Sequence, residues 1–311
     1  MANLQIVARY KFEDKFRQKQ GKSMTKRTIT LAHSPDADDI FMYMAVKFGW
    51  LGAEFDFVSS ALDIQTLNEA ALQNEFAVSA ISFALYPFIA HEYALLRTAV
   101  SFGQGYGPKL VRLKNKALKR NFKVALSGKH TTNALLFRLK YPQARIIYKN
   151  FLDIEKSVLC GEVDAGVLIH ESILEFNENL CVEAEIWDIW REFAGENLPL
   201  PLGGMALLRS LPLTTAIKVE QILTKAVSIA HNNKALLSKM LMERGLIRVD
   251  DAKLAKYLSL YANETSISMS EIQLTALDKL FEMGFRAGFY DKIIKAKDFL
   301  IPTEYENLRF S

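Results

Sequence analysis

The chain has 311 residues, of which 50% are hydrophobic and 24% charged, which is typical of a globular protein with room for two domains of average size. Its formal net charge of +4 arises within residues 1–23, because the rest of the sequence holds equal numbers of basic and acidic residues. The composition therefore excludes a nucleic-acid-binding body. No apolar run in the sequence is long enough to span a bilayer, so we expect no membrane partner.

The first 23 residues precede Met24, which stands directly before the first strand pattern. Charged residues break every apolar run in this segment, so it lacks the core of a secretory signal. We interpret residues 1–23 as an N-terminal extension and leave open disorder, an amphipathic surface helix and an artefact of start-site choice. Cys160 and Cys181 are the only cysteines, which implies no disulfide framework. The expectation is a cytoplasmic protein with reduced thiols.

From Thr28 onward, short apolar runs alternate with amphipathic segments, and this alternation predicts an α/β fold. Helical spacing occurs at 39–48, 63–74, 131–140 and 152–160, with Asp or Thr near several starts. The predicted strands are 28–33, 55–58, 76–81, 94–101, 109–113, 122–127, 145–149, 164–169 and 204–209.

After about residue 214 the strand patterns stop and four helical patterns follow, at 215–232, 234–243, 250–261 and 270–288. One economical arrangement has the chain begin in one lobe, cross to a second and return. Glycine-rich 103–108 suits the outward crossing, and 198–204 suits the return. We therefore predict lobe 1 from 24–108 plus 205–311, lobe 2 from 109–204, and a cleft between them.

Two short polar segments follow predicted strands and precede helices. In the segment from Ser34 to Asp39, Asp38 or Asp39 could cap a helix or contact a ligand, and the two roles are compatible. Ser82, taken alone, is more readily a helix cap than a ligand contact.

The segment from Ser127 to Asn133 is a better candidate for an anion site. It opens a predicted helix, Gly128 permits close approach of the backbone, and two hydroxyls and an amide can complete the hydrogen bonding. The spacing of a nucleotide P-loop, G-x-x-x-x-G-K-[ST], is absent. His130 could be a ligand contact or a helix-start residue.

His170 follows a continuously apolar strand pattern at 164–169, which predicts a strand buried on both faces with the histidine at its rim. Open α/β sheets place ligands at the carboxyl ends of strands, and histidine is suited to proton transfer near neutral pH. Adjacent residues of a strand point opposite ways, so Glu171 is not expected to be its partner. We expect no metal site, because no two histidines have helical ligand spacing. A Ser-His-Asp hydrolase is disfavoured, because there is no G-x-S-x-G turn.

Taken together, these segments resemble a known enzyme family, the 1,4-dihydroxy-6-naphthoate synthases of the futalosine route to menaquinone. The resemblance runs in order over nearly the whole chain after Met24. It rests on Ser34-Pro35 with Asp39 and Phe41, on 63–68, on 105–108, on 128–132, on Leu168-Ile169-His170-Glu171, on 198–203, and on Tyr261 with Asn263.

This resemblance implies a two-lobed fold like that of type II periplasmic solute-binding proteins. It also implies a cofactor-free lyase that converts cyclic dehypoxanthinyl futalosine to 1,4-dihydroxy-6-naphthoate with release of dihydroxyacetone. In the family the base is the histidine of the L-I-H-E segment, which corresponds to His170. Substrate contacts carry over onto Ala80, Ile81, Ser82, Thr132 and Asn133, and we add Ser34 to the expected contacts.

The chain departs from the family pattern in the first of these segments. Where relatives often read S-P-C-P-N-D-T-F, this chain has acidic residues at Asp36 and Asp38, and Asn133 stands where alanine can occur. An acid near a carboxylate-bearing substrate would repel it unless the acid is protonated or points away. The alternatives are chorismate dehydratase of the same pathway and a non-catalytic solute-binding or sensor protein. No heptad or apolar strip predicts an oligomer, so the oligomeric state is left open, with a monomer as one option.

Overall fold

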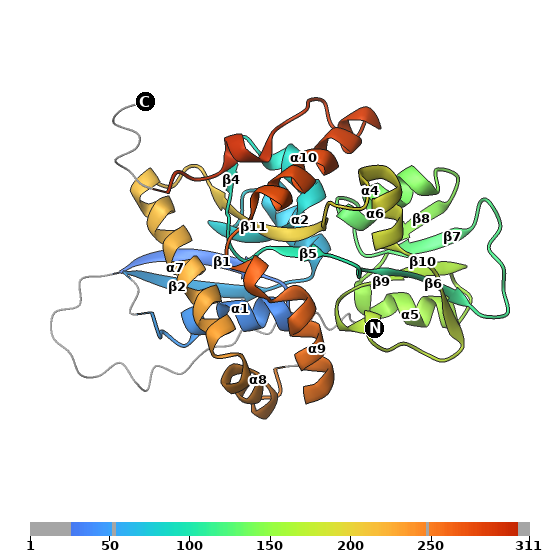
Figure 1. Ribbon diagram of the computed structural model, residues 1–311, viewed down its shortest axis with the longest axis horizontal. Helices are drawn as coiled ribbons and strands as arrows, with labels where there is room; N and C mark the ends of the chain where they lie inside the picture. The colour runs from blue at the N-terminus through green and yellow to red at the C-terminus, as the bar shows by residue number, and fades with distance from the viewer. Residues whose placement is uncertain (1–25, 52–53, 247–248, 304–311) are drawn as a thin grey trace, which may run out of the picture.

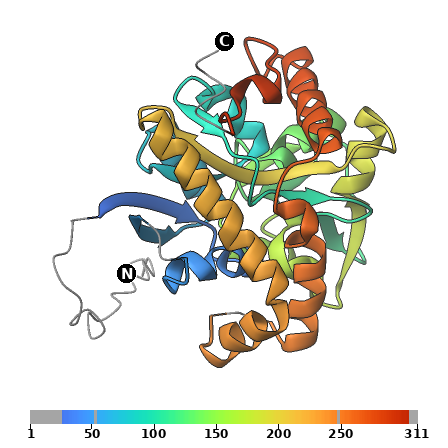
Figure 2. The same ribbon diagram turned by 60° about the vertical axis from the view of Figure 1, so that its left-hand side comes forward.

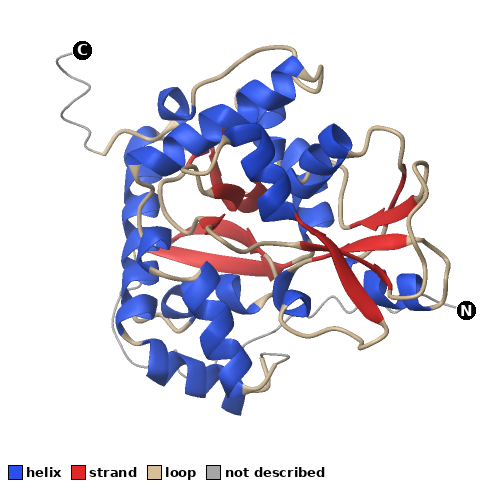
Figure 3. Ribbon diagram, turned by 45° about the vertical axis from the view of Figure 1, so that its right-hand side comes forward, coloured by secondary structure: helices blue, strands red, loops and turns tan. Residues whose placement is uncertain are grey.

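The computed structural model describes residues 26–51, 54–246 and 249–303, so the predicted extension at 1–23 lies outside the described residues. The chain forms an α/β structure with two separate sheets, one in each of two lobes (Figure 1). The first lobe is on the left of Figure 1 and the second on the right. Between them the chain passes from β5 to β6 and returns from α6 to β11 (Figure 1). Figure 3 shows helices in blue around the red strands of the molecule.

The six-stranded first sheet has the order β2-β1-β3-β11-β4, with β5 also paired to β11. Strands β1, β2 and β3 run parallel, whereas β11 runs antiparallel to β3, β4 and β5. The strands are β1 Arg27–His33, β2 Phe55–Ala61, β3 Val78–Ser82, β4 Tyr93–Leu95, β5 Ser101–Gly103 and β11 Leu200–Leu208.

The five-stranded second sheet has the order β10-β6-β9-β7-β8. Strands β7, β8 and β9 are parallel, and β6 runs antiparallel to both β9 and β10. The strands are β6 Lys109–Leu113, β7 Lys123–Leu126, β8 Arg145–Tyr148, β9 Ala165–Leu168 and β10 Leu180–Glu185. All four residues of β9 are buried, as its continuous apolar run predicts.

The helices cover both sheets, and α1 packs against α7, α8 and α9 beside the first sheet (Figure 2). Asp63 caps α2, and Thr131 caps α4 through its hydroxyl, so both helices begin next to a side chain that satisfies a free amide. The helices are α1 Ala37–Lys47, α2 Ile64–Leu72, α3 Tyr86–Ile89, α4 Thr132–Lys140, α5 Phe151–Leu159, α6 Ile186–Ala194, α7 Leu213–Asn232, α8 Lys234–Glu243, α9 Asp251–Tyr261 and α10 Glu271–Arg286, with short 3₁₀ turns η1 Phe83–Leu85, η2 His170–Ile173, η3 Glu264–Ser266 and η4 Ala296–Phe299.

Three features differ from the elements predicted from sequence. The run 94–101 is two short strands rather than one, because the chain turns at Ala99, whose φ is +55°. Strand β10 and helix α6 were not predicted. Strand β11 begins at Leu200 rather than 204, with a register shift between Pro201 and Gly203 where it meets β5.

The returning strand therefore starts before the predicted lobe boundary at 204/205. Every strand of the first sheet comes from 27–103 or 200–208, and every strand of the second from 109–185. We propose the lobe assignment on this basis, with the return boundary before Leu200.

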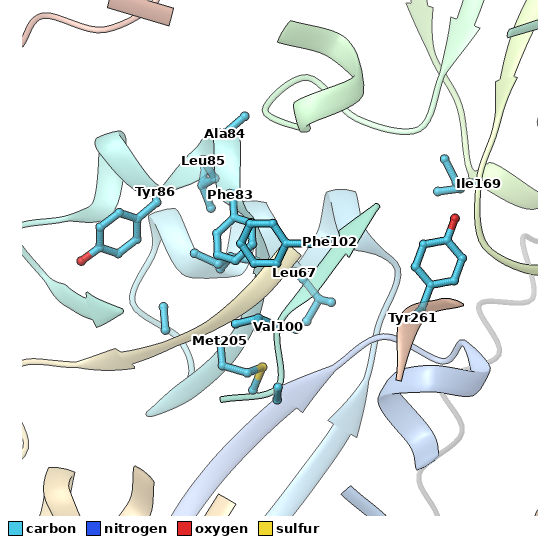
Figure 4. Close-up of a cluster of buried hydrophobic side chains, with 14 of the residues drawn as sticks. Leu67, Phe83, Ala84, Leu85, Tyr86, Val100, Phe102, Ile169, Met205 and Tyr261 are labelled. Carbon is cyan, nitrogen blue, oxygen red and sulfur yellow. The ribbon is translucent and has the colours of Figure 1, made fainter. Parts of the chain in front are cut away.

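A continuous hydrophobic core runs through both lobes. In the first lobe, Phe83 packs against Phe102 with ring centroids 5.2 Å apart, above Leu67 and Met205 (Figure 4). Farther along, the Tyr261 hydroxyl points toward Ile169, which belongs to the second lobe (Figure 4). Within the described ranges, no helix has both the length and the apolar character that crossing a bilayer requires.

Candidate active site

A cavity lies between the lobes, where the carboxyl ends of β1, β3, β7 and β9 meet. This is the location where open α/β sheets bind ligands. All seven residues predicted from sequence line it: Ser34, Ala80, Ile81, Ser82, Thr132, Asn133 and His170. The other lining residues are Asp36, Asp38, Asp39, Ile64, Ala99, Ser101, Pro108, Ser127, Thr131, Ile169, Leu202, Gly203, Gly204, Tyr257 and Tyr261.

His170 follows β9 directly and opens the 3₁₀ turn η2. Its φ is +56°, in the left-handed region that non-glycine residues rarely adopt. Such strained conformations cluster at functional sites, where the surrounding structure holds them in place. The edge of the imidazole meets Phe151, with ring centroids 4.9 Å apart at 74°.

The two imidazole nitrogens of His170 have different surroundings. Nδ1 contacts the Oδ2 carboxylate oxygen of Asp36, which belongs to the first lobe. Nε2 is buried and has no hydrogen-bond partner within the described protein. A buried polar atom left unpaired costs free energy, so an unpaired nitrogen in a cavity indicates a place for a ligand.

The Asp36–His170 contact shifts the pKa of both groups. Burial acts to raise the pKa of Asp36, but the positive charge of His170 and the hydrogen bond to it outweigh burial and lower that pKa. For His170, burial acts to lower the pKa, and the negative charges of Asp36, Glu171 and Asp39 together raise it. Each group therefore stabilises the charged form of the other. Asp36 stays a carboxylate to lower pH, and His170 stays an imidazolium to higher pH, than either would alone.

The other two acids of this segment, Asp38 and Asp39, have raised pKa values. Burial and the nearby charges of Asp36, Asp39 and Glu171 raise the pKa of Asp38 well above its ordinary value. Burial and the charge of Asp36 raise the pKa of Asp39 to about 8. The repulsion expected between these acids and a substrate carboxylate is thus weakened, because Asp36 is paired and the raised pKa values of Asp38 and Asp39 favour their neutral forms.

Asp38 and Asp39 occupy the first turn of α1, where negative charge or a hydrogen-bond acceptor is favourable. Neither is the N-cap, which is Asp36, and the Asp36 side chain makes no capping hydrogen bond. Asp39 Oδ2 accepts a 2.7 Å hydrogen bond from the Ser34 amide. Asp38 Oδ1 accepts a 3.2 Å bond from the Tyr257 hydroxyl.

Ser82 is the N-cap residue of η1, as expected from its position, but its side chain makes no capping bond to that turn. Its hydroxyl oxygen instead accepts a 2.9 Å hydrogen bond from the Thr132 amide at the start of α4 and donates a 3.3 Å bond to the Leu202 carbonyl. Ser82 belongs to the first sheet and Thr132 follows a strand of the second, so this bond joins the two halves of the cavity.

Among the described residues of the cavity lining, four buried side-chain atoms lack a close hydrogen-bond partner: the Ser34 hydroxyl, Asp36 Oδ1, Asn133 Oδ1 and His170 Nε2. Ser34 and Asn133 are more than nine-tenths buried, and Ser34 also interacts with the Asp36 carboxyl, which helps to lower the pKa of Asp36. Unpaired groups of this kind are available to hold a hydroxyl or carboxyl group of a substrate. No lysine or arginine is present among the described lining residues, so hydroxyls and amides would have to hold an anionic group.

Not every residue singled out from the sequence reaches the cavity. His130 packs against Phe88 instead, with ring centroids 5.1 Å apart. The Lys129 amide donates a 2.9 Å bond to Gln65 Oε1, which is a second contact between the lobes. Glu171 is not bonded to His170; its Oε1 accepts a 3.0 Å hydrogen bond from the Ala37 amide at the start of α1.

Sequence reasoning did not assign roles to Tyr257 and Tyr261, which line the cavity from α9. Their spacing of four residues puts both on one face of a helix, and that spacing was the available signal. Tyr261 also meets Tyr106 edge to face at 5.3 Å. Across the described residues, no group of three or more His, Cys, Asp or Glu is arranged to hold a metal ion.

Comparison with known proteins matches residues 29–286 to a family described as menaquinone biosynthesis. Two curated relatives carry the name 1,4-dihydroxy-6-naphthoate synthase. The Streptomyces coelicolor protein is 28% identical over 272 residues, covering 85% of this chain and 95% of the relative. The Thermus thermophilus protein is 28% identical over 257 residues, covering 81% of this chain and 92% of the relative.

Solved structures show the same architecture. A protein from Archaeoglobus fulgidus is 32% identical with a TM-score of 0.76, covering 84% of this chain and 98% of its own. The alkanesulfonate-binding protein of Xanthomonas axonopodis pv. citri has a TM-score of 0.66 at 13% identity, covering 88% of this chain and 97% of its own. The latter similarity establishes the two-lobed fold of periplasmic binding proteins for this chain.

Proposed function

The chain belongs to the menaquinone biosynthesis family, and we propose that it is a 1,4-dihydroxy-6-naphthoate synthase. The proposed reaction opens cyclic dehypoxanthinyl futalosine, releases dihydroxyacetone and leaves the aromatic 1,4-dihydroxy-6-naphthoate. It is a carbon–carbon lyase reaction. The observation that carries the proposal is His170, whose unpaired Nε2 belongs to a cavity at the carboxyl ends of four strands.

In this proposal His170 is the base. Its Nε2 removes a proton from the spirocyclic part of the substrate, and the electron pair left behind begins the elimination. The bond to the sugar-derived fragment then breaks, and formation of the aromatic ring supplies driving force. A positioned base of this kind contributes roughly 10²- to 10⁴-fold to a rate.

The remaining cavity residues are proposed to bind and orient the substrate. The Ser34 hydroxyl and Asn133 Oδ1 are two of the buried polar atoms that lack a close partner in the described lining, and Ala80, Ile81 and Thr132 line the cavity beside them. The raised pKa values of Asp38 and Asp39 favour neutral acids, which would tolerate a substrate carboxylate. The bonds between lobes close the cleft, which excludes water and aligns the base with the substrate.

The direct test is incubation of the purified protein with cyclic dehypoxanthinyl futalosine and, separately, with chorismate, followed by mass analysis of the products. We expect 1,4-dihydroxy-6-naphthoate and dihydroxyacetone from the first compound. The His170→Ala variant should lose roughly 10²- to 10⁴-fold in kcat. His130→Ala is the matched control, because that histidine lies outside the cavity lining, and it should keep near wild-type turnover.

Two outcomes would contradict the proposal. Consumption of chorismate instead would identify a dehydratase of the same pathway. Binding of either compound without turnover would identify a non-catalytic binding protein with the same fold.

A further inference from the structure

Inside the cavity, a contact between a carboxylate and an imidazole joins the two lobes. Asp36 precedes α1 in the first lobe, and His170 follows β9 in the second, 134 positions later in the sequence. Asp36 Oδ2 meets the His170 Nδ1. The proposed lyase reaction requires a base at His170, but it does not by itself require a carboxylate behind that base.

His170 is the principal partner of the Asp36 side chain. Asp36 is 4% exposed, its side chain makes no capping hydrogen bond to α1, and the interaction with Ser34 lowers its pKa less than His170 does. Burial of a carboxylate is unfavourable unless the charge is paired. The contact with His170 is the pairing that makes its buried position tenable.

The imidazole of His170 is held in one orientation. Phe151 meets it edge to face, its backbone is fixed in the left-handed region, and Asp36 engages Nδ1. A carboxylate that accepts a hydrogen bond from Nδ1–H places the proton of the neutral ring on Nδ1. The lone pair is then on Nε2, the nitrogen without a protein partner.

We propose that Asp36 is a positioning residue for His170, and that it makes Nε2 the reactive nitrogen only when the lobes close. This inference rests on the proposed function, in which His170 is the base. In an open cleft the carboxylate and the imidazole would each be hydrated, and either tautomer of the ring could form. Closure on the substrate would assemble the base at the moment when the proton to be removed is in place.

Several charged groups face His170 and define its pH behaviour. Asp36 and Asp39 approach it from the first lobe, and Glu171 is its neighbour in the chain. The hydroxyl of Tyr257, on α9, donates a hydrogen bond to Asp38, and the charges of Asp38, Asp36 and Glu171 add to burial in raising the pKa of Tyr257. Replacing Asp36 alone leaves Glu171 and Asp39 in place, so the effect of Asp36 can be measured separately.

The test is the Asp36→Asn variant, studied with the proposed product 1,4-dihydroxy-6-naphthoate bound, so that no turnover takes place during the titration. The chain contains five histidines, so the imidazole signals can be titrated by NMR and that of His170 assigned from its loss in His170→Ala. With a ligand-bound, closed protein, we expect a wild-type His170 with a raised pKa and the proton of its neutral form on Nδ1. In Asp36→Asn the pKa of His170 should fall and the tautomer preference should weaken.

The second measurement is turnover as a function of pH. Because His170 must be unprotonated to act as a base, wild-type kcat should rise with pH through the raised pKa of His170. In Asp36→Asn this rise should move to lower pH, since the imidazolium is no longer stabilised by Asp36. At the plateau, kcat should be roughly 10- to 1,000-fold below wild type, within the contribution of a positioned base, with little change in KM.

The matched control is Glu175→Gln, which removes a different ion pair between the lobes, with Lys253 of α9, outside the cavity lining. It should leave both kcat and the His170 titration unchanged. Asp36→Ala should lower the His170 pKa and kcat as Asp36→Asn does. If circular dichroism shows that only one of the two variants is folded, that variant is sufficient for the test.

An unchanged pKa and tautomer of His170 in the folded Asp36 variants would overturn this inference, whatever the turnover. An effect of equal size in Glu175→Gln would also overturn it, because loss of lobe attraction would then explain both. If the wild type fails to turn over cyclic dehypoxanthinyl futalosine, the proposed function is overturned. A His170 titration that depends on Asp36 would still support the pairing across the cleft.

Discussion

Gly166 lies in the middle of β9, four residues before His170, and its lack of a side chain allows α5 to approach the sheet. A Cβ atom at this position would lie 2.4 Å from Ile154 Cγ2 and 3.0 Å from Val158 Cγ2. Both neighbours are fully buried on α5, and β-branched side chains are restricted in χ1. The Gly166→Ala variant must therefore displace α5 or bend β9.

The expected cost follows from two opposing effects. Overpacking of a core by an added methyl group costs about 1–3 kcal/mol, whereas replacing glycine by alanine restricts the unfolded chain and contributes about 0.4–1 kcal/mol in the other direction. The net expectation is a destabilisation of about 1.3 kcal/mol, within a range of roughly 0–2.6 kcal/mol. The central value corresponds to a decrease in Tm of roughly 2 °C for a chain of 311 residues.

The assay is urea unfolding followed by tryptophan fluorescence, because Trp187 and Trp190 both lie on α6 of the second lobe. A double-mutant cycle with Ile154→Ala identifies the contact, since that substitution removes the Cγ2 atom that would clash. Ile154→Ala alone should cost about 2–5 kcal/mol. The double variant should be more stable than the sum of the single changes predicts, by at least about 1 kcal/mol.

The control is Gly107→Ala, where the nearest atom is the flexible end of Leu200 at 3.1 Å, so a smaller change is expected. A Gly166→Ala protein as stable as wild type, or additive effects in the cycle, would refute the close packing of α5 on β9. A stable variant with intact turnover would also show that the position of His170 does not depend on this contact.

Three further substitutions test the cavity. Asp39→Asn should become progressively more stable relative to wild type as pH rises from about 4 to about 8, because folded Asp39, with a pKa of about 8, keeps a proton that the unfolded chain has lost. Urea unfolding at several pH values measures the difference, and parallel stability curves for the two proteins would contradict the reasoning. Ser82→Ala leaves the Thr132 amide without its acceptor and should destabilise the closed form by about 1–3 kcal/mol. We expect this loss to raise KM, and an unchanged KM would mean that the contact is dispensable. Tyr257→Phe removes the hydrogen bond to Asp38 and should cost about 1 kcal/mol by thermal unfolding, with no loss expected if water replaces the hydroxyl.

Much of the fold could be predicted from sequence periodicity because most strands are short apolar runs between amphipathic helices. The failures have local causes. Strand β10 is an edge strand paired only with β6, and its residues Leu180–Glu185 include two acids and only one fully buried side chain, so the apolar signal is weak. The run 94–101 is apolar at 94–96 and 99–100 but holds Arg97 and Thr98 in its middle, and this pattern does not by itself reveal the turn at Ala99.

The candidate site was predictable to the extent that it depends on strand ends. Ser34, Ser82, Thr132 and His170 each follow a strand, so topology brings them to one cavity. The partnership of Asp36 with His170 could not be predicted, because it depends on how two lobes meet and no local pattern encodes that. From the sequence, Asp36 was an obstacle to substrate binding; in the structure it is paired.

The position of β11 has a consequence for synthesis of the chain on the ribosome. This strand lies between β3 and β4 in the first sheet, yet it comes after all five strands of the second sheet in the sequence. Domains tend to fold as units while the chain emerges. The second lobe can complete its sheet once residue 185 has emerged, whereas the first lobe must wait until residue 208.

During that interval β3 presents an unpaired edge, which is a hazard for association with other chains. All five of its residues are buried in the finished protein, so the waiting strand exposes side chains that belong to the interior. We expect nascent chains that stop between residues 109 and 199 to depend on chaperones far more than the completed protein does. The late arrival of one central strand thus sets the order in which the two halves of the molecule mature.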